Sequence, residues 1–351
     1  MGEVGPAHNL GEYGMAGLTE AEEISDIAFG YMGSKALFAA LDLGIFTHLS
    51  GGTRTAGEIA RAAGLPEERC RTLMTALTGL GLTVKRGDGF ANSAAAEAFL
   101  VRGAKHDFGD YLRLQVGRQM YPLMDQIGDA LTGRLADGAT DSYATWFADA
   151  EQARLYSESQ HAGSLGPARG LARRVDLTGA RHLLDVGGGT GAFAITLCRA
   201  FPELRATILD LPNVAEIGAA FVADAGLSDR ISYATGDALA ADWPGAQDVI
   251  LMSYLLSGVP DHAHDGLIAR AFDHLAPGGR LLIHDFIVDE DRTGPKNTAL
   301  WQLQHTAFTP EARSLSDGWL AGRMEQAGFA EVEVGPLIPG MTKLAHGRRG
   351  A

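Results

Sequence analysis

The chain has 351 residues, 46% of them apolar, and a formal net charge of −14 at pH 7. This length predicts two domains, and the apolar content suffices for a full core, which excludes global disorder. The acidic balance argues against nucleic acid as a partner, because nucleic-acid binders present a basic face. No apolar run is long enough to span a membrane, and the N-terminus lacks a signal-peptide pattern, so we expect a cytoplasmic protein without membrane association.

The N-terminal part predicts a mobile tail followed by a small helical domain. Residues 1–18 are rich in glycine and acidic side chains, as mobile tails often are. Within 19–106, apolar residues recur at helical spacing over 24–41, and a helix, turn, helix pattern follows over 55–81. A glycine-containing turn at 87–89 then predicts a hairpin.

This order of elements is typical of a winged helix. The second helix of the pair carries Glu67 and Glu68 next to Arg69 and Arg71. Acidic side chains in that position disfavour DNA binding. We therefore predict a dimerisation module.

The remaining chain predicts a helical layer and then an α/β domain. Residues 107–175 read as several helices with aromatic and methionine insertions, some of which we expect to face a substrate. Over 176–351, strands alternate with helices, which implies a doubly wound, Rossmann-like sheet. The expected strands are 182–186, 206–210, 230–234, 248–254 and 279–285, followed by an antiparallel pair near 332–334 and 341–344.

The stretch 181–191 is the most informative part of the chain. Leu183 to Val186 predicts a buried parallel strand, which breaks into glycines between Gly187 and Gly191 before a helical pattern begins. A strand, a glycine turn and a helix in this order let the backbone approach a nucleotide-like ligand closely.

Acidic residues stand at three places around this turn. Asp185 lies at its mouth, where a carboxylate would repel a pyrophosphate but suits an ammonium group. Asp210 closes the next strand, where it can accept hydrogen bonds from ribose hydroxyls, and Asp237 follows the third strand, placed to meet an adenine amino group. This set resembles the S-adenosylmethionine site of class I methyltransferases; a nicotinamide enzyme and a fold without cofactor are the alternatives. The predicted cofactor-binding residues are Ser164, Asp185, Gly187, Gly189, Asp210, Leu211, Gly236, Asp237 and Ser253.

From about residue 20 to 350, the chain resembles the small-molecule O-methyltransferases of plant phenolic and bacterial natural-product pathways. The landmarks are the winged-helix module and the segments 185–191, 210–212, 236–237 and 275–283. The resemblance implies a homodimer in which each N-terminal module helps to close the active site of its partner. It also implies that Ser164 lies near the cofactor.

The chain departs from the family pattern at the catalytic base. Family members carry Leu-His-Asp-Trp after the fourth strand, and that histidine deprotonates the acceptor hydroxyl. Here the equivalent stretch, 254–261, places Ser257 at this position, and a serine has no useful pKa for the role. Either another group acts as base or the chemistry differs. His262 and His264, just beyond, look like a solvated helix start.

Other histidines are candidates for the missing role. His284 and Asp285 end the fifth strand, His305 lies on the helix expected to cover the acceptor, and His161 lies on a substrate-facing helix. Imidazoles from three separate elements can form a metal site with an open position, with a divalent or ferric ion, zinc or iron, as the expected metal. The alternatives are one histidine acting as base without metal, or packing roles alone.

A metal would replace the absent base. The α-keto acid C-methyltransferases of peptide-antibiotic pathways look like this scaffold and use a metal ion to acidify the carbon beside a 2-oxo group. The first hypothesis is therefore C-methylation at the β-carbon of a small 2-oxo acid. Its metal ligands would be His161, His284 and His305, with Asp285 as orienting group or proton acceptor. Its predicted substrate contacts are Arg113, Arg118, Gln160 and Ser257, the arginines pairing with a carboxylate.

Two further hypotheses stay open. One is O-methylation of a phenolic or polyketide hydroxyl, with His161 or His305 as a relocated base. The other is a protein of the same scaffold that binds the cofactor without transferring its methyl group. The substrate would accordingly be a small molecule, either a 2-oxo acid or a hydroxylated aromatic.

Overall fold

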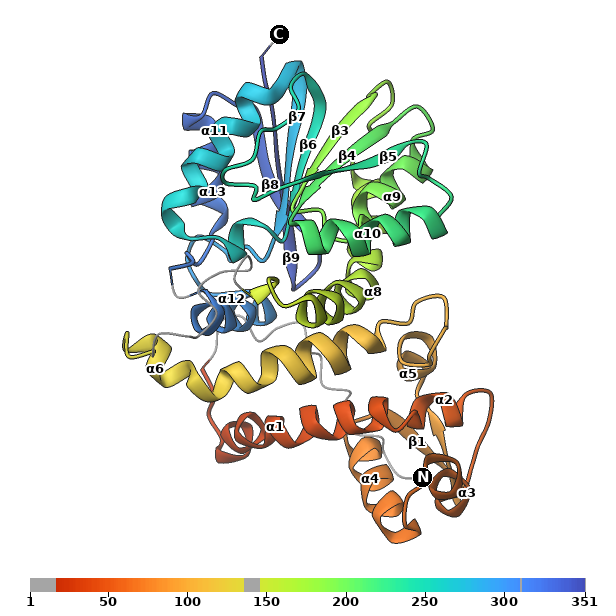
Figure 1. The fold of residues 1–351 in the computed structure, drawn as a ribbon. Coiled ribbons are helices and arrows are strands. Elements are labelled where there is room, and N and C mark those ends of the chain that lie inside the picture. Colours follow the sequence, from red (N-terminus) through yellow and green to blue (C-terminus); the bar gives the residue numbers. More distant parts are fainter. Residues whose placement is uncertain (1–16, 136–145, 310, 351) are drawn as a thin grey trace, which may run out of the picture.

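The computed structural model of the chain describes residues 17–135, 146–309 and 311–350, so nearly all of the predicted tail lies outside the described residues. An N-terminal module, a helical layer and a seven-stranded α/β domain follow one another in space (Figure 1). None of the described helices is long and apolar enough to cross a membrane. The domain boundaries at 106 and 175 stay predictions.

The N-terminal module has the expected helix and hairpin order, with its own apolar core. Its third helix begins sharply because Thr55 and Glu58 form a capping box, which contributes about 1 kcal/mol. The helix ends at Gly64, which takes the left-handed conformation that glycine adopts without strain. The elements are α1 (Ala21–Asp42), α2 (Ile45–Leu49), α3 (Ala56–Ala63), α4 (Glu67–Gly79), β1 (Thr83–Arg86), β2 (Gly89–Asn92) and α5 (Ala94–Phe99).

The first half of α1 exposes large apolar side chains to solvent. Ile27 is 66% exposed and Ile24 61%, and Phe29, Tyr31 and Met32 are each more than half exposed. The second half of the helix instead packs into the module core. An exposed apolar row of this kind marks an interaction surface.

A helical layer separates the module from the sheet. Its longest helix, α8 (Ala150–Arg174), begins at Asp149, whose carboxylate accepts hydrogen bonds from two backbone N–H groups of the first turn. The segment η1 (Tyr111–Met120) is wound as a π-helix, which the sequence pattern did not predict. Such winding is rare and often occurs at functional sites. The layer also contains η2 (Tyr121–Gln126) and α6 (Ile127–Leu131).

The C-terminal domain is the expected doubly wound sheet, in the strand order β5-β4-β3-β6-β7-β9-β8. Neighbouring residues of β3 point to opposite faces: Leu183 packs with α8 and α9, and Leu184 with α11 and α13. The strands are β3 (His182–Val186), β4 (Arg205–Asp210), β5 (Ile231–Thr235), β6 (Gln247–Ser253), β7 (Leu275–Asp285), β8 (Ala330–Ile338) and β9 (Thr342–Arg348). The helices are α9 (Ala192–Ala200), α10 (Pro212–Asp224), η3 (Leu256–Gly258), η4 (Asp261–Ala263), α11 (His264–His274), α12 (Lys296–Phe308) and α13 (Asp317–Gln326).

The sheet reverses its winding at β3. This strand pairs in parallel with β4 on one side and β6 on the other, while β9 runs antiparallel to β7. In open sheets of this kind, ligands bind beyond the carboxyl ends of the strands at the reversal point. That edge faces α8 and α12 (Figure 1), so any site there is enclosed by the helical layer.

Candidate active site

Two cavities lie at the carboxyl edge of the sheet. The first, of about 200 Å³, is lined by the glycine turn after β3, the ends of β4 to β6 and one face of α8. The second, of about 340 Å³, lies between α8, α12, η1 and the segment after α5. Tyr156, Gln160 and Tyr254 belong to both walls, so the cavities meet at these side chains.

The floor of the first cavity is the glycine turn over a buried carboxylate. Asp185 is fully buried, and its carboxylate oxygens make no hydrogen bond to the described residues. A Cβ at Gly188 would lie 2.6 Å from the Asp185 Cγ, so this approach of backbone to carboxylate requires glycine. Burial and the neighbouring charge of Asp210 raise the pKa of Asp185 to about 7.

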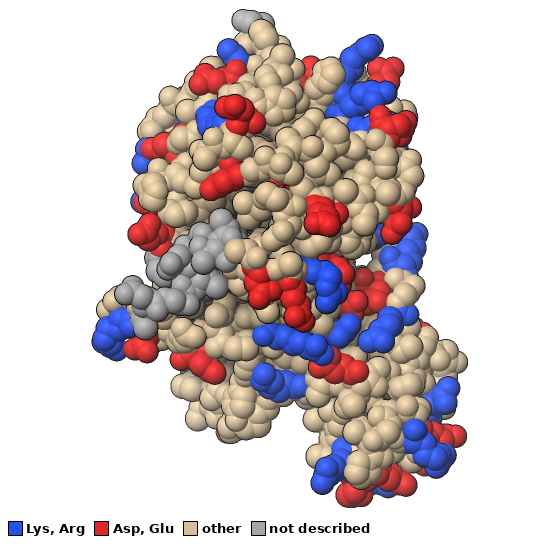
Figure 2. Space-filling view, in the orientation of Figure 1, with Lys and Arg blue, Asp and Glu red and all other residues tan. Residues whose placement is uncertain are grey.

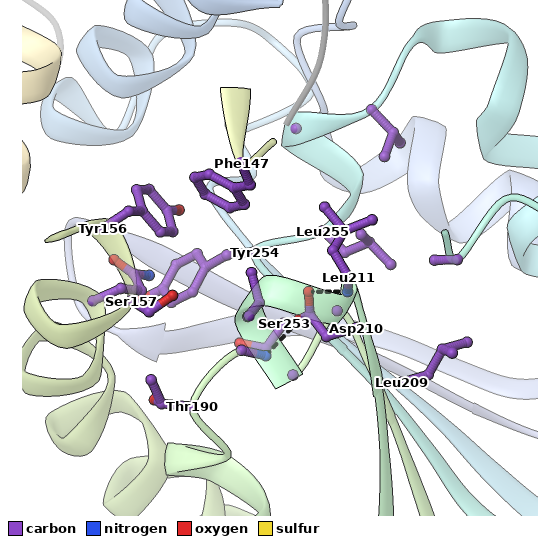
Figure 3. Close-up of a pocket in the computed structure, with 18 of the residues that line it drawn as sticks. Phe147, Tyr156, Ser157, Thr190, Leu209, Asp210, Leu211, Ser253, Tyr254 and Leu255 are labelled. Atoms are coloured by element: carbon purple, nitrogen blue, oxygen red, sulfur yellow. Dashed lines mark hydrogen bonds between the residues drawn. The ribbon is translucent and has the colours of Figure 1, made fainter. Parts of the chain in front are cut away.

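Asp210 joins the end of β4 to the glycine turn. Its Oδ2 accepts a hydrogen bond from the Gly189 N–H and its Oδ1 one from the Leu211 N–H, each at 2.7 Å (Figure 3). Burial raises the pKa of Asp210 to about 6, and the two N–H groups oppose that shift. The cavity therefore concentrates negative charge at neutral pH, which suits a cationic ligand.

The raised pKa values set how pH changes the stability of the ligand-free protein. Folding raises the pKa values of Asp185 and Asp210, so the folded protein favours their protonated forms. Their contribution to the free energy of unfolding is therefore present at low pH and is lost as the pH rises through about 6 to 7. We therefore expect Asp185→Asn to raise the thermal unfolding midpoint more at pH 8 than at pH 5, by scanning calorimetry. The exposed Asp224→Asn serves as the control. An equal shift at both pH values would contradict the prediction.

Tyr233 supports the glycine turn from below, and the sequence analysis missed it. Its hydroxyl on β5 donates to the Gly189 carbonyl at 2.9 Å. A Cβ at Gly218 on α10 would lie 2.0 Å from this hydroxyl, so the tyrosine fits only beneath a glycine. The sequence could have indicated this role, because Tyr233 is a tyrosine within the strand that leads to Asp237.

The three histidines predicted as metal ligands are held by different neighbours. His161 Nδ1 lies 2.7 Å from the Thr190 hydroxyl, and its ring stacks on Phe221. His284 is fully buried between the hydroxyls of Ser253 and Thr342, each 2.9 Å from a ring nitrogen. Burial lowers the pKa of His161 to about 4 and that of His284 to about 3, so both rings are neutral.

His305 lines the second cavity, but both of its ring nitrogens are engaged. Its Nδ1–H donates to the Ser257 carbonyl at 2.8 Å, and its Nε2 accepts a hydrogen bond from the Trp301 indole N–H at 3.1 Å. Trp301 stacks on Phe286 at 4.6 Å between ring centroids. This packing leaves His305 no free lone pair with which to accept a proton, and burial lowers its pKa to about 4.

These contacts correct the prediction of a three-histidine metal site. Within residues 17–135, 146–309 and 311–350, no group of three or more His, Cys, Asp or Glu side chains is arranged to hold a metal ion. The physical reason is that each imidazole already bonds a hydroxyl, a carbonyl or an indole of its own surroundings. His161 and His284 also line neither cavity.

Comparison with known proteins decides the family. Residues 123–330 match the model of the O-methyltransferase domain, and residues 25–102 match that of the O-methyltransferase dimerisation domain. The chain belongs to this family. It is an S-adenosylmethionine-dependent methyltransferase with an N-terminal dimerisation domain.

Named relatives cover nearly the whole methyltransferase. A 3-hydroxy-5-methyl-1-naphthoate 3-O-methyltransferase of Streptomyces sahachiroi is 32% identical over 88% of this chain and 89% of its own. A tetracenomycin polyketide synthesis 8-O-methyl transferase of Streptomyces glaucescens is 30% identical over 93% and 96%. The crystal structure of human N-acetylserotonin methyltransferase with S-adenosylmethionine shares the fold, with a TM-score of 0.82 and 20% identity over 96% of this chain and all of that one.

The structure gathers the predicted cofactor-binding residues of the methyltransferase around one cavity. Asp185 lies directly beneath the glycine turn. The others line the first cavity: Ser164, Gly187, Gly189, Asp210, Leu211, Gly236, Asp237 and Ser253. Figure 3 shows Asp210 and Leu211 on one side of this cavity and the rings of Phe147, Tyr156 and Tyr254 on another.

The predicted substrate contacts divide into two groups. Arg113 and Arg118 both form ion pairs with Asp42, at 3.5 and 2.8 Å, and neither lines the two cavities. The structure thus places neither arginine beside the two cavities at the carboxyl edge of the sheet. Gln160 lies in the wall of both cavities with its Oε1 buried and unbonded, and Ser257 lies in the wall of the second.

Asp285 lies behind Ser257 at the end of β7. It is fully buried, its Oδ2 accepts from the Ser257 N–H at 3.0 Å, and its Oδ1 accepts from the Phe286 N–H at 2.8 Å. Burial raises the pKa of Asp285, and its hydrogen bonds to Ser257 and Phe286 oppose that shift. His264, expected at a solvated helix start, is instead fully buried against Trp319, and its Nε2–H donates to the Leu256 carbonyl at 2.8 Å.

Proposed function

We propose that this methyltransferase acts on a hydroxyl group of a planar aromatic or polyketide-type small molecule. The observation that carries the proposal is the aromatic wall of the second cavity, which meets the first cavity at Tyr254. That wall contains Tyr111, Tyr156, Tyr254, Phe286 and Trp301. Stacked aromatic side chains favour flat, apolar ligands. Relatives named for a naphthoate and for tetracenomycin polyketide synthesis support the same acceptor class.

The first cavity fits S-adenosylmethionine through its charge and its glycine turn. The unbonded carboxylate of Asp185 and the carboxylate of Asp210 offer acceptors to a cation and to ribose hydroxyls. Gly236 and Asp237 close the cavity at the end of β5. When bound, this cofactor supplies an electrophilic methyl group. The protein's own residues orient the acceptor and remove its proton.

We infer that Ser257 and Asp285 take that proton. Ser257 replaces the family histidine in the cavity wall, and its buried Oγ makes no hydrogen bond to the described residues. Asp285, which accepts a hydrogen bond from the Ser257 backbone N–H, is the neighbouring carboxylate. As the acceptor hydroxyl gives its proton to Ser257 Oγ, Ser257 passes its own proton to a carboxylate oxygen of Asp285. A carboxylate with a raised pKa is a better general base. Burial raises the pKa of Tyr111 and Tyr254, so these phenols stay protonated and cannot serve as bases.

The structure does not support the hypothesis of C-methylation of a 2-oxo acid. That hypothesis required three histidines around a metal, and each of them is engaged elsewhere. The second cavity also offers aromatic walls, which a short aliphatic acid would not fill.

An acceptor panel tests the proposed function. Purified protein with S-adenosylmethionine would be incubated separately with a hydroxynaphthoate, a polycyclic hydroxyquinone, an aromatic amine and a 2-oxo acid. Products would be identified by mass spectrometry and NMR. We expect a methyl ether from the first two compounds. Methylation of the 2-oxo acid alone, or of the amine alone, would overturn the assignment to hydroxyl acceptors.

We also propose that the exposed apolar row of α1 is the homodimer interface. On the face that Figure 2 shows, most side chains around the N-terminal end of this helix are uncharged, and the family model that matches residues 25–102 is a dimerisation domain. We expect Ile27→Glu to halve the molecular mass measured by light scattering, because a charge cannot be buried there unpaired. Leu300→Glu, at an exposed leucine on α12, is the matched control. A dimer that survives Ile27→Glu would contradict this interface.

A further inference from the structure

One end of the second cavity gathers basic side chains. Lys105 and His106, from the segment after α5, line it together with Arg169 of α8. Lys105 and His106 are solvent-exposed and Arg169 is half-buried, whereas Ser257 and His305 at the other end are buried. The cavity therefore runs from a cationic mouth to a buried end beside the methyl-donor site.

Lys105 and Arg169 form no ion pair with the described residues. Neither Lys105 nor Arg169 lies within ion-pair distance of a described carboxylate, whereas Arg113 and Arg118 are both paired. Arg169 instead lies 3.4 Å from the His106 ring nitrogen. Asp107, in the same wall, accepts hydrogen bonds from the backbone N–H groups of Gly103 and Gly109 and so is held by backbone. In a protein of net charge −14, cations at a cavity mouth provide a local attraction for an anionic ligand.

Helix α8 connects the junction of the two cavities with the mouth of the second cavity. Gln160, where the cavities meet, and Arg169 are on the same helix and line the same cavity. A nine-residue separation at the α-helical rise corresponds to about 13 Å. This rise separates the two residues along the helix axis, so the cavity is elongated along α8 and suits an extended molecule better than a single ring.

We propose that Arg169, with Lys105, binds an acidic group of the acceptor, so that the substrate is an extended aromatic acid. This proposal rests on the proposed function for its aromatic acceptor, and it adds an acidic group bound at the mouth of the cavity. The Arg169 guanidinium would donate charge-assisted hydrogen bonds to a carboxylate. Gly166 of the same wall has no neighbour within 4 Å of where a Cβ would be, and Gly163 lets the Tyr111 ring pack directly against α8.

Binding without turnover tests the proposal. Isothermal titration calorimetry would compare a hydroxynaphthoate, with hydroxyl and carboxylate on opposite rings, with its primary carboxamide, in the absence of S-adenosylmethionine. We expect the acid to bind about ten-fold more tightly than the amide, since a partly exposed charge-assisted contact is discounted by solvent. Arg169→Gln should remove this preference, and Arg169→Lys should retain part of it.

The matched control is Arg173→Gln, an exposed arginine on the same helix outside both cavities. It should leave the acid-to-amide ratio unchanged. Equal binding of acid and amide, an unchanged ratio in Arg169→Gln, or no binding of the acid at millimolar concentration would each overturn the proposal. If the acid binds but is not methylated, the acid-binding site at Arg169 would be supported and the proposed methylation of a hydroxyl group would be contradicted.

Discussion

Asp210→Asn should weaken S-adenosylmethionine binding by about 100-fold, the largest effect expected on the cofactor side. A neutral amide loses the charge that attracts a cation, and it turns two charge-assisted hydrogen bonds into weaker ones or none. Each such bond is worth about 1.5–3 kcal/mol. Without the hydrogen bond from the Gly189 N–H, the glycine turn is also held less firmly against β4. Calorimetric titration with S-adenosylmethionine gives the dissociation constant directly.

The fold itself should survive this substitution. Burial favours a neutral side chain at this position, whereas the weakening of the two hydrogen bonds opposes it. Scanning calorimetry at pH 8 should therefore find a folded variant with an unfolding midpoint close to that of the native protein. Asp224→Asn, on the exposed face of α10, controls for a simple change in net charge. A dissociation constant within three-fold (about 0.7 kcal/mol) of the native value would remove Asp210 from the cofactor site.

Ser257→Ala should lower kcat by about 100-fold or more, the range typical of losing a general base. The substitution removes only the hydroxyl: the backbone N–H that donates to Asp285 and the carbonyl that accepts from His305 both remain. Cofactor binding should therefore not change. Steady-state kinetics with the best acceptor of the panel would measure the loss.

The pH profile separates a proton route from a packing effect. At a pH above the pKa of the acceptor hydroxyl, the acceptor arrives ionised, so the activity of Ser257→Ala should recover toward the native level. Ser257→Thr keeps a hydroxyl and should retain most activity at every pH. A uniform loss in Ser257→Ala across the pH range would contradict proton transfer through this residue.

Local patterns predicted the cofactor side of the protein well. The strand before Gly187, the acidic strand ends at Asp210 and Asp237 and the alternation after 176 each follow from short stretches of sequence. In a parallel sheet the carboxyl ends of the strands share one edge, so residues at those ends become neighbours without further information. The grouping of these residues around the first cavity could therefore be predicted from the sequence, and their role in binding the cofactor stays a prediction.

The acceptor side depends on packing that no local pattern records. His305 was a reasonable base by position, but Trp301 one turn earlier on α12 occupies its Nε2. His284 stands at the end of a strand, yet Thr342 on β9 binds it from a segment distant in sequence. Whether an imidazole is free depends on such partners, and composition and spacing do not reveal them.

The division into two cavities also bears on how such an enzyme can acquire new substrates. Their walls share only Tyr156, Gln160 and Tyr254 among the described residues. Substitutions at the cationic mouth or along η1 can reshape what enters the second cavity while every carboxylate and glycine of the first stays in place. With the methyl donor in the first cavity and the acceptor in the second, as proposed, acceptor range and methyl-donor affinity would be separable traits. A library of substitutions confined to the wall of the second cavity would then change the acceptor without changing cofactor binding.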